Sequence, residues 1–184
     1  MSAADELAAL MADRGQRNYG ENVTIAEHAL ITAATAESNG AEDTLIAACL
    51  LHDVGHWLDE PDDDFGIHSH GETGGAWVAE RFPAAVAEPV RLHVDAKRYL
   101  CARDPEYHDR LSPASQYTLT KQGGPMSTEE AAAFAANPHA EDALRLRQWE
   151  DDFGKLTGVE IPPLSHFRPL LDRLETGRAK EPNP

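Results

Sequence analysis

Apolar residues recur along most of the chain at intervals of three to four positions, the spacing that places them on one face of an α-helix. In the first such stretch, Leu7, Leu10 and Met11 share a face, and Gly15 ends the helix. Runs of β-branched residues, which favour strands, are few. The pattern predicts an all-α protein. It predicts helices at 4–14, 23–38 and 42–54, helices that begin near 70, 88, 113 and 128, a polar link after residue 100, and final helices at 140–152 and 165–176.

The most informative stretch is the apolar run 45–51, which leads directly to the pair His52 and Asp53 and stops at Gly55. Imidazole and carboxylate groups suit first-row metals. Neighbouring residues on a helix point about 100° apart, so this pair can serve two ions, with the carboxylate as the bridge, better than it can chelate one. Alone the pair is weak evidence, because a histidine at a helix C-terminus can simply stabilise the helix dipole. Further candidate ligands strengthen the metal interpretation: His28, His70, His93 and an acidic group near Asp151.

Length and charge limit the classes of function. A chain of 184 residues suits one domain, with a core over about 19–176 and a polar tail, 177–184, that we expect to be disordered. A net charge of −16 disfavours nucleic acid and anionic membranes as partners. The sequence shows no signal peptide or membrane-spanning run, so we expect a cytoplasmic monomer or small homo-oligomer. Its two cysteines form neither a disulfide framework nor a zinc pattern. Because the net charge is so negative, an anionic substrate would need a local cluster of basic groups.

Two later helices carry polar groups that suit an anionic ligand. His93 and Lys97 lie one helical turn apart and share a face. Ser115, Thr118 and Gln122 follow an i, i+3, i+7 stripe along the next helix. The alternative for Lys97 is a solvated surface side chain, and each histidine taken alone could equally be a packing residue.

The order His, His-Asp, His, His, Asp on successive helices resembles the HD-domain superfamily of metal-dependent proteins. Within it, several strings resemble the small mixed-valent diiron oxygenases that cleave hydroxylated organophosphonates. The resemblance covers about residues 19–167, and its most specific strings are His-Val-Asp-Ala-Lys-Arg-Tyr-Leu at 93–100 and Gln-Gly-Gly-Pro-Met at 122–126. It implies an HD-type helical bundle around two iron ions, Fe(II)/Fe(III). The implied ligands are His28, His52, Asp53 as the bridge, His70, His93 and one late carboxylate.

Two features of the family compete for that last ligand. In the family the carboxylate follows a tryptophan directly and precedes a lysine by four residues. Here Trp149 selects Glu150, whereas Lys155 selects Asp151. We expect Asp151, because it is an aspartate and keeps the spacing to the lysine, and Glu150 is the alternative.

The resemblance also implies a substrate pocket. Glu21 matches a carboxylate near the amino end of the substrate, and Tyr19 lies one position from a tyrosine that occupies an iron until the substrate arrives. A phosphonate dianion needs cations and several hydrogen-bond donors. A cationic nitrogen could be met by Glu21 and Tyr19 through ion pairing or cation–π contact. The groups that match the phosphonate pocket are His56, Lys97, Ser115, Thr118 and Gln122, of which His56 and Lys97 would act in catalysis with His52 and Asp53.

The implied reaction uses O₂ to cleave the C–P bond of a 1-hydroxy-2-aminoethyl-type phosphonate. It gives phosphate with glycine, or with glycine betaine if the nitrogen is trimethylated. Iron suits this chemistry, whereas zinc has no redox chemistry. An HD-type metal-dependent phosphohydrolase acting on a small phosphate ester or nucleotide is the alternative. It needs fewer metal ligands, so the additional pair His70 and His93 counts against it. A metal-stabilised binding module is a third possibility, although it would not need the polar face around Lys97.

Overall fold

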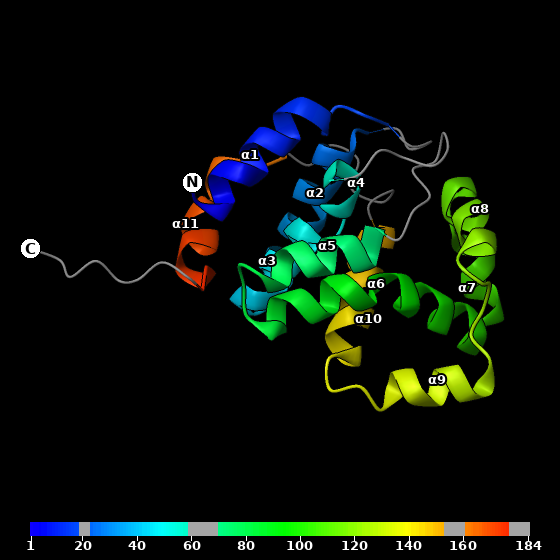
Figure 1. Cartoon of the computed structure of the whole chain (residues 1–184). Coiled ribbons are helices and arrows are strands. Elements are labelled where there is room, and N and C mark those ends of the chain that lie inside the picture. The colour runs from blue at the N-terminus through cyan, green and yellow to red at the C-terminus, as the bar shows by residue number, and fades with distance from the viewer. Residues whose placement is uncertain (19–22, 59–69, 153–160, 177–184) are drawn as a thin grey trace, which may run out of the picture.

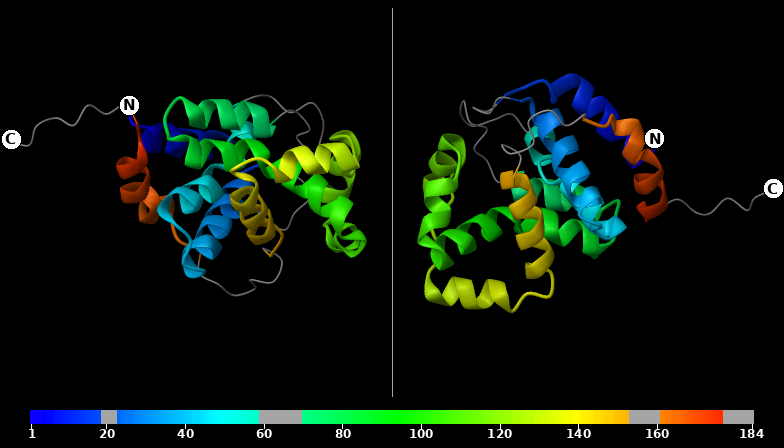
Figure 2. Two further views of the ribbon diagram at one scale, coloured as in Figure 1. Left: turned by 90° about the horizontal axis from the view of Figure 1, so that it is seen from below. Right: turned by 180° about the vertical axis from the view of Figure 1, so that it is seen from behind.

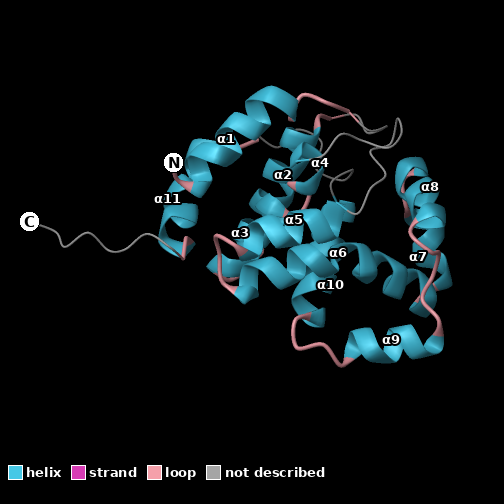
Figure 3. Ribbon diagram, in the orientation of Figure 1, coloured by secondary structure: helices cyan, strands magenta, loops and turns pink. Residues whose placement is uncertain are grey.

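The computed structural model describes residues 1–18, 23–58, 70–152 and 161–176, which form helices and no strand (Figure 1, Figure 3). The all-α prediction is therefore confirmed. No helix in these ranges is long and apolar enough to cross a membrane. The helices are α1 (Ala3–Arg14), α2 (Ile25–Ser38), α3 (Asp43–Leu51), α4 (Gly55–Leu58), α5 (His70–Ala79), α6 (Ala84–Arg103), α7 (Pro105–Arg110), α8 (Pro113–Lys121), α9 (Thr128–Ala135), α10 (Ala140–Asp151) and α11 (Leu164–Leu174).

The centre of the molecule is a group of helices packed around α3 and α6. Helix α5 lies along α6, and α10 packs against α6, α2 and α3 (Figure 1, Figure 2). Helices α1 and α11 pack together at one end, close to the N-terminus, while α7, α8 and α9 lie at the other end. Segments from both halves of the chain therefore meet in the middle of the bundle.

Helix α3 is apolar on all sides, and helices α2, α6, α10 and α11 pack around it. Every residue from 45 to 51 is buried, and together they form the middle of the largest hydrophobic cluster. Burying each leucine side chain contributes about 1.5–3 kcal/mol relative to leaving it in water. His52 is the C-terminal cap of this helix and Asp53 follows it. The packed core around α3 therefore fixes the backbone positions of His52 and Asp53.

The predicted helix 42–54 is shorter than expected. Helix α3 ends at Leu51, and Gly55 begins the short helix α4 instead of stopping the previous one. The reason is a tertiary contact. A Cβ atom at Gly55 would lie 2.1 Å from the carbonyl oxygen of His70, so only glycine lets α4 approach the first residue of α5.

The helix expected to begin at Glu88 starts earlier, at Ala84, and contains Pro89. This proline lacks only one backbone donor near the start of a 20-residue helix, a loss that the remaining turns tolerate. Helix α6 also continues to Arg103, and the expected polar link contains α7, whose start is capped by the side chain of Asp104. The long α6 carries His93 and Lys97 in its interior.

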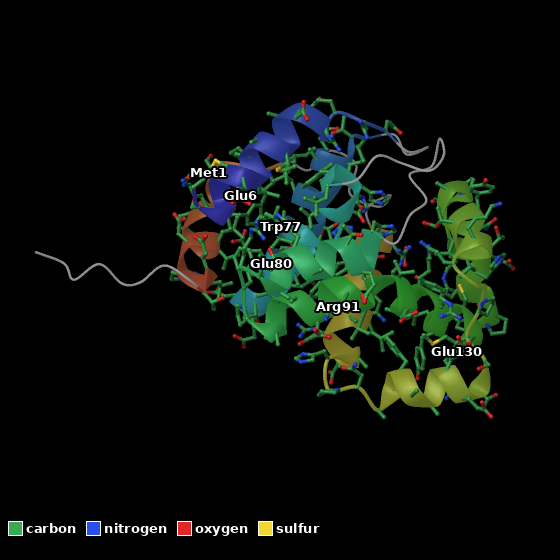
Figure 4. The ribbon with its side chains drawn as sticks, in the orientation of Figure 1. Met1, Glu6, Trp77, Glu80, Arg91 and Glu130 are labelled. Carbon is green, nitrogen blue, oxygen red and sulfur yellow. The ribbon has the colours of Figure 1, made fainter. Side chains whose placement is uncertain are left out.

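Side-chain contacts tie the outer helix α1 to the central bundle. The guanidinium of Arg81 donates from Nη2 to Glu6 Oε2 at 2.9 Å and lies 4.2 Å above the ring of Trp77. Figure 4 labels Glu6 on α1 and Trp77 on α5. Glu80 accepts a further bond from Arg81 Nη1 at 3.0 Å. These contacts hold α1 beside α5, far along the chain from it.

Replacing Gly55 with alanine should destabilise the metal-free protein by about 1–3 kcal/mol, because the added methyl group must push the backbone of α5 away. The same displacement moves His70, so the metal content should fall. Chemical denaturation of the metal-free protein and metal analysis of the loaded protein measure the two effects. Wild-type stability together with wild-type metal content would contradict this account of Gly55.

Candidate metal centre

Four histidines from four parts of the fold surround the carboxylate of Asp53. His28 comes from the first turn of α2, His52 caps α3, His70 is the first residue of α5, and His93 comes from the middle of α6. Their side chains range from buried to 15 % exposed, and that of Asp53 is 14 % exposed. The cluster is thus enclosed by the central helices.

The two carboxylate oxygens of Asp53 face different pairs of histidines. Oδ2 lies 3.3 Å from His52 Nε2 and 3.9 Å from His28 Nε2. Oδ1 lies 3.8 Å from the Nε2 atoms of both His70 and His93. Nitrogen and oxygen ligands sit about 2 Å from a metal ion, so ligands of one ion lie about 3 Å apart. Each triad could therefore hold one ion, with Asp53 shared between them.

Backbone contacts orient two of these rings for metal binding. His52 Nδ1 lies 2.8 Å from the carbonyl oxygen of Cys49, and His93 Nδ1 lies 2.6 Å from that of Val90. A carbonyl only accepts, so each Nδ1 carries the proton and each Nε2 presents a lone pair. His52 Nε2 is buried and faces Asp53 Oδ2 at 3.3 Å. Without its proton, this nitrogen and the carboxylate oxygen would both present lone pairs, which an ion between them would satisfy.

The charges around the cluster favour a cation at its centre. Burial lowers the pKa values of His28, His70 and His93, which keeps these rings in the neutral form that binds metals. Burial has the largest single effect on the pKa of His52 and lowers it, but Asp53, Glu150 and the carbonyl of Cys49 together outweigh burial and raise that pKa to about 9. Without a metal, a proton on Nε2 supplies the positive charge that Asp53 favours. A metal ion would replace that proton.

His56 lies beside the second triad. Its Nε2 atom is 3.7 Å from Asp53 Oδ1, and its ring stacks on that of His70 with centroids 4.0 Å apart. Among the described residues, the two ligand triads do not include it. His56 is therefore placed to contact a molecule bound at the second triad.

The two candidates for the last carboxylate differ in how fully their oxygens are hydrogen-bonded. Both oxygens of Asp151 accept from Arg147, and Oδ2 also accepts from the hydroxyl of Tyr107. Glu150 accepts from Arg147 through Oε1 at 2.5 Å, while its Oε2 is buried with no hydrogen-bond partner in the part of the chain that the structure covers.

The charge of Glu150 also acts on the cluster. Burial has the largest effect on the pKa of His93, and Glu150 is the strongest opposing influence. Burial raises the pKa of Glu150 itself, but Arg147, His52 and His93 together lower it, so the carboxylate is ionised. The geometry therefore favours Glu150, the alternative, over Asp151 as a further ligand.

Next to the cluster, helices α6, α8 and α10 bring two buried cations to hydroxyl groups. Lys97 is 4 % exposed and donates from Nζ to Thr118 Oγ1 at 2.9 Å. Arg147 is 3 % exposed, and its Nη2 donates to Ser115 Oγ at 3.5 Å. Burial, with a further contribution from Arg147, lowers the pKa of Lys97 to about 7. We call Lys97, Ser115, Thr118 and Arg147 the anion pocket. It brings two buried cations together, with the carboxylates of Glu150 and Asp151 as the ion-pair partners of the Arg147 guanidinium.

The structure places these four residues close together. Lys97, Ser115 and Thr118 were predicted from the sequence as substrate groups, but Arg147 was not. Its position three and four residues before the acidic pair 150–151 was a usable signal, because such residues share a helical face. Gln122 is the C-terminal cap of α8, one turn beyond Thr118, and its Oε1 is buried without a hydrogen-bond partner in the described ranges. The predicted substrate residues Tyr19 and Glu21, and the anchor Lys155, lie outside the described residues.

Comparison with known proteins agrees with this architecture. The HD-domain model matches residues 25–176. The chain is 43 % identical to 1-hydroxy-2-(trimethylamino)ethylphosphonate dioxygenase (glycine-betaine-forming) of Leisingera caerulea, over 88 % of this chain and 84 % of that protein. It is also 43 % identical to hydroxymethylphosphonate dioxygenase of Gimesia maris, over 86 % and 81 % of the two chains.

A third relative, an uncharacterized protein of Acanthamoeba polyphaga mimivirus, is 36 % identical over 85 % of this chain and 74 % of its own. The family model spans the helices that carry all four histidines and Asp53. The chain therefore belongs to the HD-domain family, on the same branch as these phosphonate dioxygenases.

Proposed function

We propose that this protein is a non-haem diiron oxygenase that uses O₂ to cleave the C–P bond of a 1-hydroxyphosphonate. The observation that carries the proposal is the carboxylate of Asp53, whose two oxygens each face a separate pair of histidines. The relatives that act on hydroxylated phosphonates support it. In the balanced reaction, the hydroxyphosphonate and O₂ give a carboxylate, hydrogen phosphate and a proton.

The residues present fit two metal ions, and mixed N/O ligands with redox chemistry favour iron over zinc. When bound, the irons supply the redox chemistry that lets O₂ oxidise the hydroxylated carbon. Among the described residues, His70 and His93 would hold one ion with Asp53 Oδ1. The other ion would be held by His28, His52, Asp53 Oδ2 and Glu150.

The anion pocket would bind the phosphonate group. Lys97 and Arg147 supply the charge, and the Ser115 hydroxyl, which accepts from Arg147, can donate its own hydrogen to the phosphonate. The Thr118 hydroxyl accepts from Lys97 and donates to the carbonyl of Ser115, so it would hold the ammonium in place. We include Gln122 in the pocket because it lies one turn beyond Thr118 and its side-chain amide nitrogen can donate to a phosphonate oxygen. His56, next to the second triad, could hold or give a proton at a phosphonate oxygen.

Residues outside the anion pocket would bind the organic end of the substrate. The two phosphonate dioxygenases named above share the phosphonate group and differ in the organic end, because one substrate carries a trimethylammonium group and the other carries none. We propose that Glu21, with Tyr19 beside it in the sequence, meets a cationic nitrogen. The products would then be phosphate and glycine or glycine betaine.

The reaction predicts that the iron-loaded protein consumes O₂ and releases phosphate in equal amounts from a 1-hydroxyphosphonate. Asp53→Ala should abolish both iron binding and turnover, because the bridge touches both ions. Oxygen uptake, phosphate release and metal analysis measure these effects, with the surface variant Asp142→Ala as the control. Phosphate release from a phosphate ester without O₂ would instead identify a phosphohydrolase.

The two late carboxylates can be separated by conservative variants. Glu150→Gln should lose iron, because an amide is a poorer ligand and removes a charge that acts on His52 and His93. Asp151→Asn should retain iron, because Asp151 contacts Arg147 and Tyr107 instead. Metal content per chain is the measurement. Iron loss in Asp151→Asn alone would return the ligand role to Asp151.

Lys97→Met should lower kcat/KM about 30- to 1000-fold, roughly 2–4 kcal/mol, because a buried charge-assisted contact to a dianion is lost. Iron content should not change. The exposed Lys121→Met is the control. Since the pKa of Lys97 is about 7, the charged form is present below that pH and is lost above it. The kcat/KM of the wild type should therefore fall as the pH rises through about 7, and a Lys97→Met profile that keeps this fall would contradict the assignment.

A further inference from the structure

We propose that Tyr107 and Asp151 are positioning residues that hold the guanidinium of Arg147 in the anion pocket. This inference rests on the proposed function, since it assigns these two residues to the phosphonate end of the same site. It also gives Asp151 a role other than metal binding.

One edge of the Arg147 guanidinium is fixed by a fork of hydrogen bonds. Nε donates to Asp151 Oδ2 at 3.1 Å, and Nη2 donates to Asp151 Oδ1. Nε also donates to the hydroxyl oxygen of Tyr107 at 3.1 Å, and that hydroxyl donates to Asp151 Oδ2. A bidentate pair of this kind sets the plane of the guanidinium as well as its position.

The rest of the guanidinium faces the functional site. Nη1 donates to Glu150 Oε1, and Nη2 also donates to Ser115 Oγ. A guanidinium has five donor hydrogens, so one edge can be tied to Asp151 while the other end serves the pocket. Arg147 therefore links the proposed metal ligand Glu150 to the hydroxyl groups that would meet the phosphonate.

The electrostatics explain why the cation needs this support. Arg147 and Lys97 are both almost completely buried, and Arg147 acts to lower the pKa of Lys97. Two buried cations repel each other, and Glu150 would share its charge with a metal ion. Asp151 supplies a second negative charge to Arg147, so the guanidinium can remain beside Lys97 before an anion arrives.

Tyr107 adds a geometric constraint between helices. Its side chain is buried in a small hydrophobic cluster with Leu111 at the end of α7 and Leu119 of α8. Its hydroxyl reaches Arg147 and Asp151 on α10. Because α8 carries Ser115 and Thr118, Tyr107 sets the position of Arg147 relative to the hydroxyl side of the pocket.

The test is the affinity of the iron-loaded protein for methylphosphonate, which has no C1 hydroxyl group, measured by calorimetry. Tyr107→Phe removes only the hydroxyl, and Asp151→Asn removes the charge at constant size. Each should raise the dissociation constant about 10- to 100-fold while iron content stays at the wild-type level. Asp142→Asn, which removes the partner of Arg145 on the same helix, should have no effect.

A double-variant cycle separates positioning from general support of the fold. In an Arg147→Lys background, which lacks the fork, Tyr107→Phe should change the dissociation constant less than about 2-fold. The same loss in both backgrounds would overturn the proposal, as would wild-type affinity in both single variants. With a hydroxyphosphonate substrate, KM should rise more than kcat falls.

The outcomes distinguish this inference from the proposed reaction. If methylphosphonate binds and the variants weaken it, but no hydroxyphosphonate is oxidised, the positioning role stands and the proposed reaction fails. If turnover occurs and the variants bind methylphosphonate like the wild type, the positioning role fails alone. If the wild type does not bind methylphosphonate, the positioning role fails, and the turnover of a 1-hydroxyphosphonate decides the proposed reaction separately.

Discussion

The structure depends on one buried carboxylate, Asp53, held between two pairs of imidazole rings. An ionised carboxylate is costly inside a protein unless charges or hydrogen bonds compensate it. Here the compensation comes from helices α2, α3, α5 and α6, whose histidines lie 3.3–3.9 Å from its two oxygens. The helix packing that forms the core therefore also brings the histidines to the carboxylate of Asp53.

Sequence periodicity was sufficient for the fold class and for most helices, because apolar spacing and end signals are local. It failed where a distant contact decides the outcome. Gly55 looks like a helix stop, but its role is to let α4 touch the carbonyl of His70. Pro89 looks like a helix start, but α6 begins earlier and tolerates it. The helix α7 was missed because the sequence there is short and polar.

The candidate site could be predicted only in part. The resemblance pointed to the four histidines and Asp53, and the structure brings these side chains together. Counting along the chain could not choose between Glu150 and Asp151, because the choice depends on the direction in which each leaves α10. The spacing of Arg147 to the acidic pair 150–151 was a local signal for an ion pair, but its place in the pocket depends on contacts with Tyr107 and Ser115, which lie 40 and 32 residues away in sequence. The assignments of Tyr19 and Glu21 stay predictions.

The central claim is that Asp53 bridges two iron ions. Electron paramagnetic resonance on iron-loaded protein, reduced without oxygen and then partly oxidised, tests it most directly, because only bridged ions couple their spins strongly. The account predicts a coupled Fe(II)/Fe(III) signal that changes when a 1-hydroxyphosphonate is added. A signal from isolated Fe(III) alone, unchanged by that ligand, would contradict it.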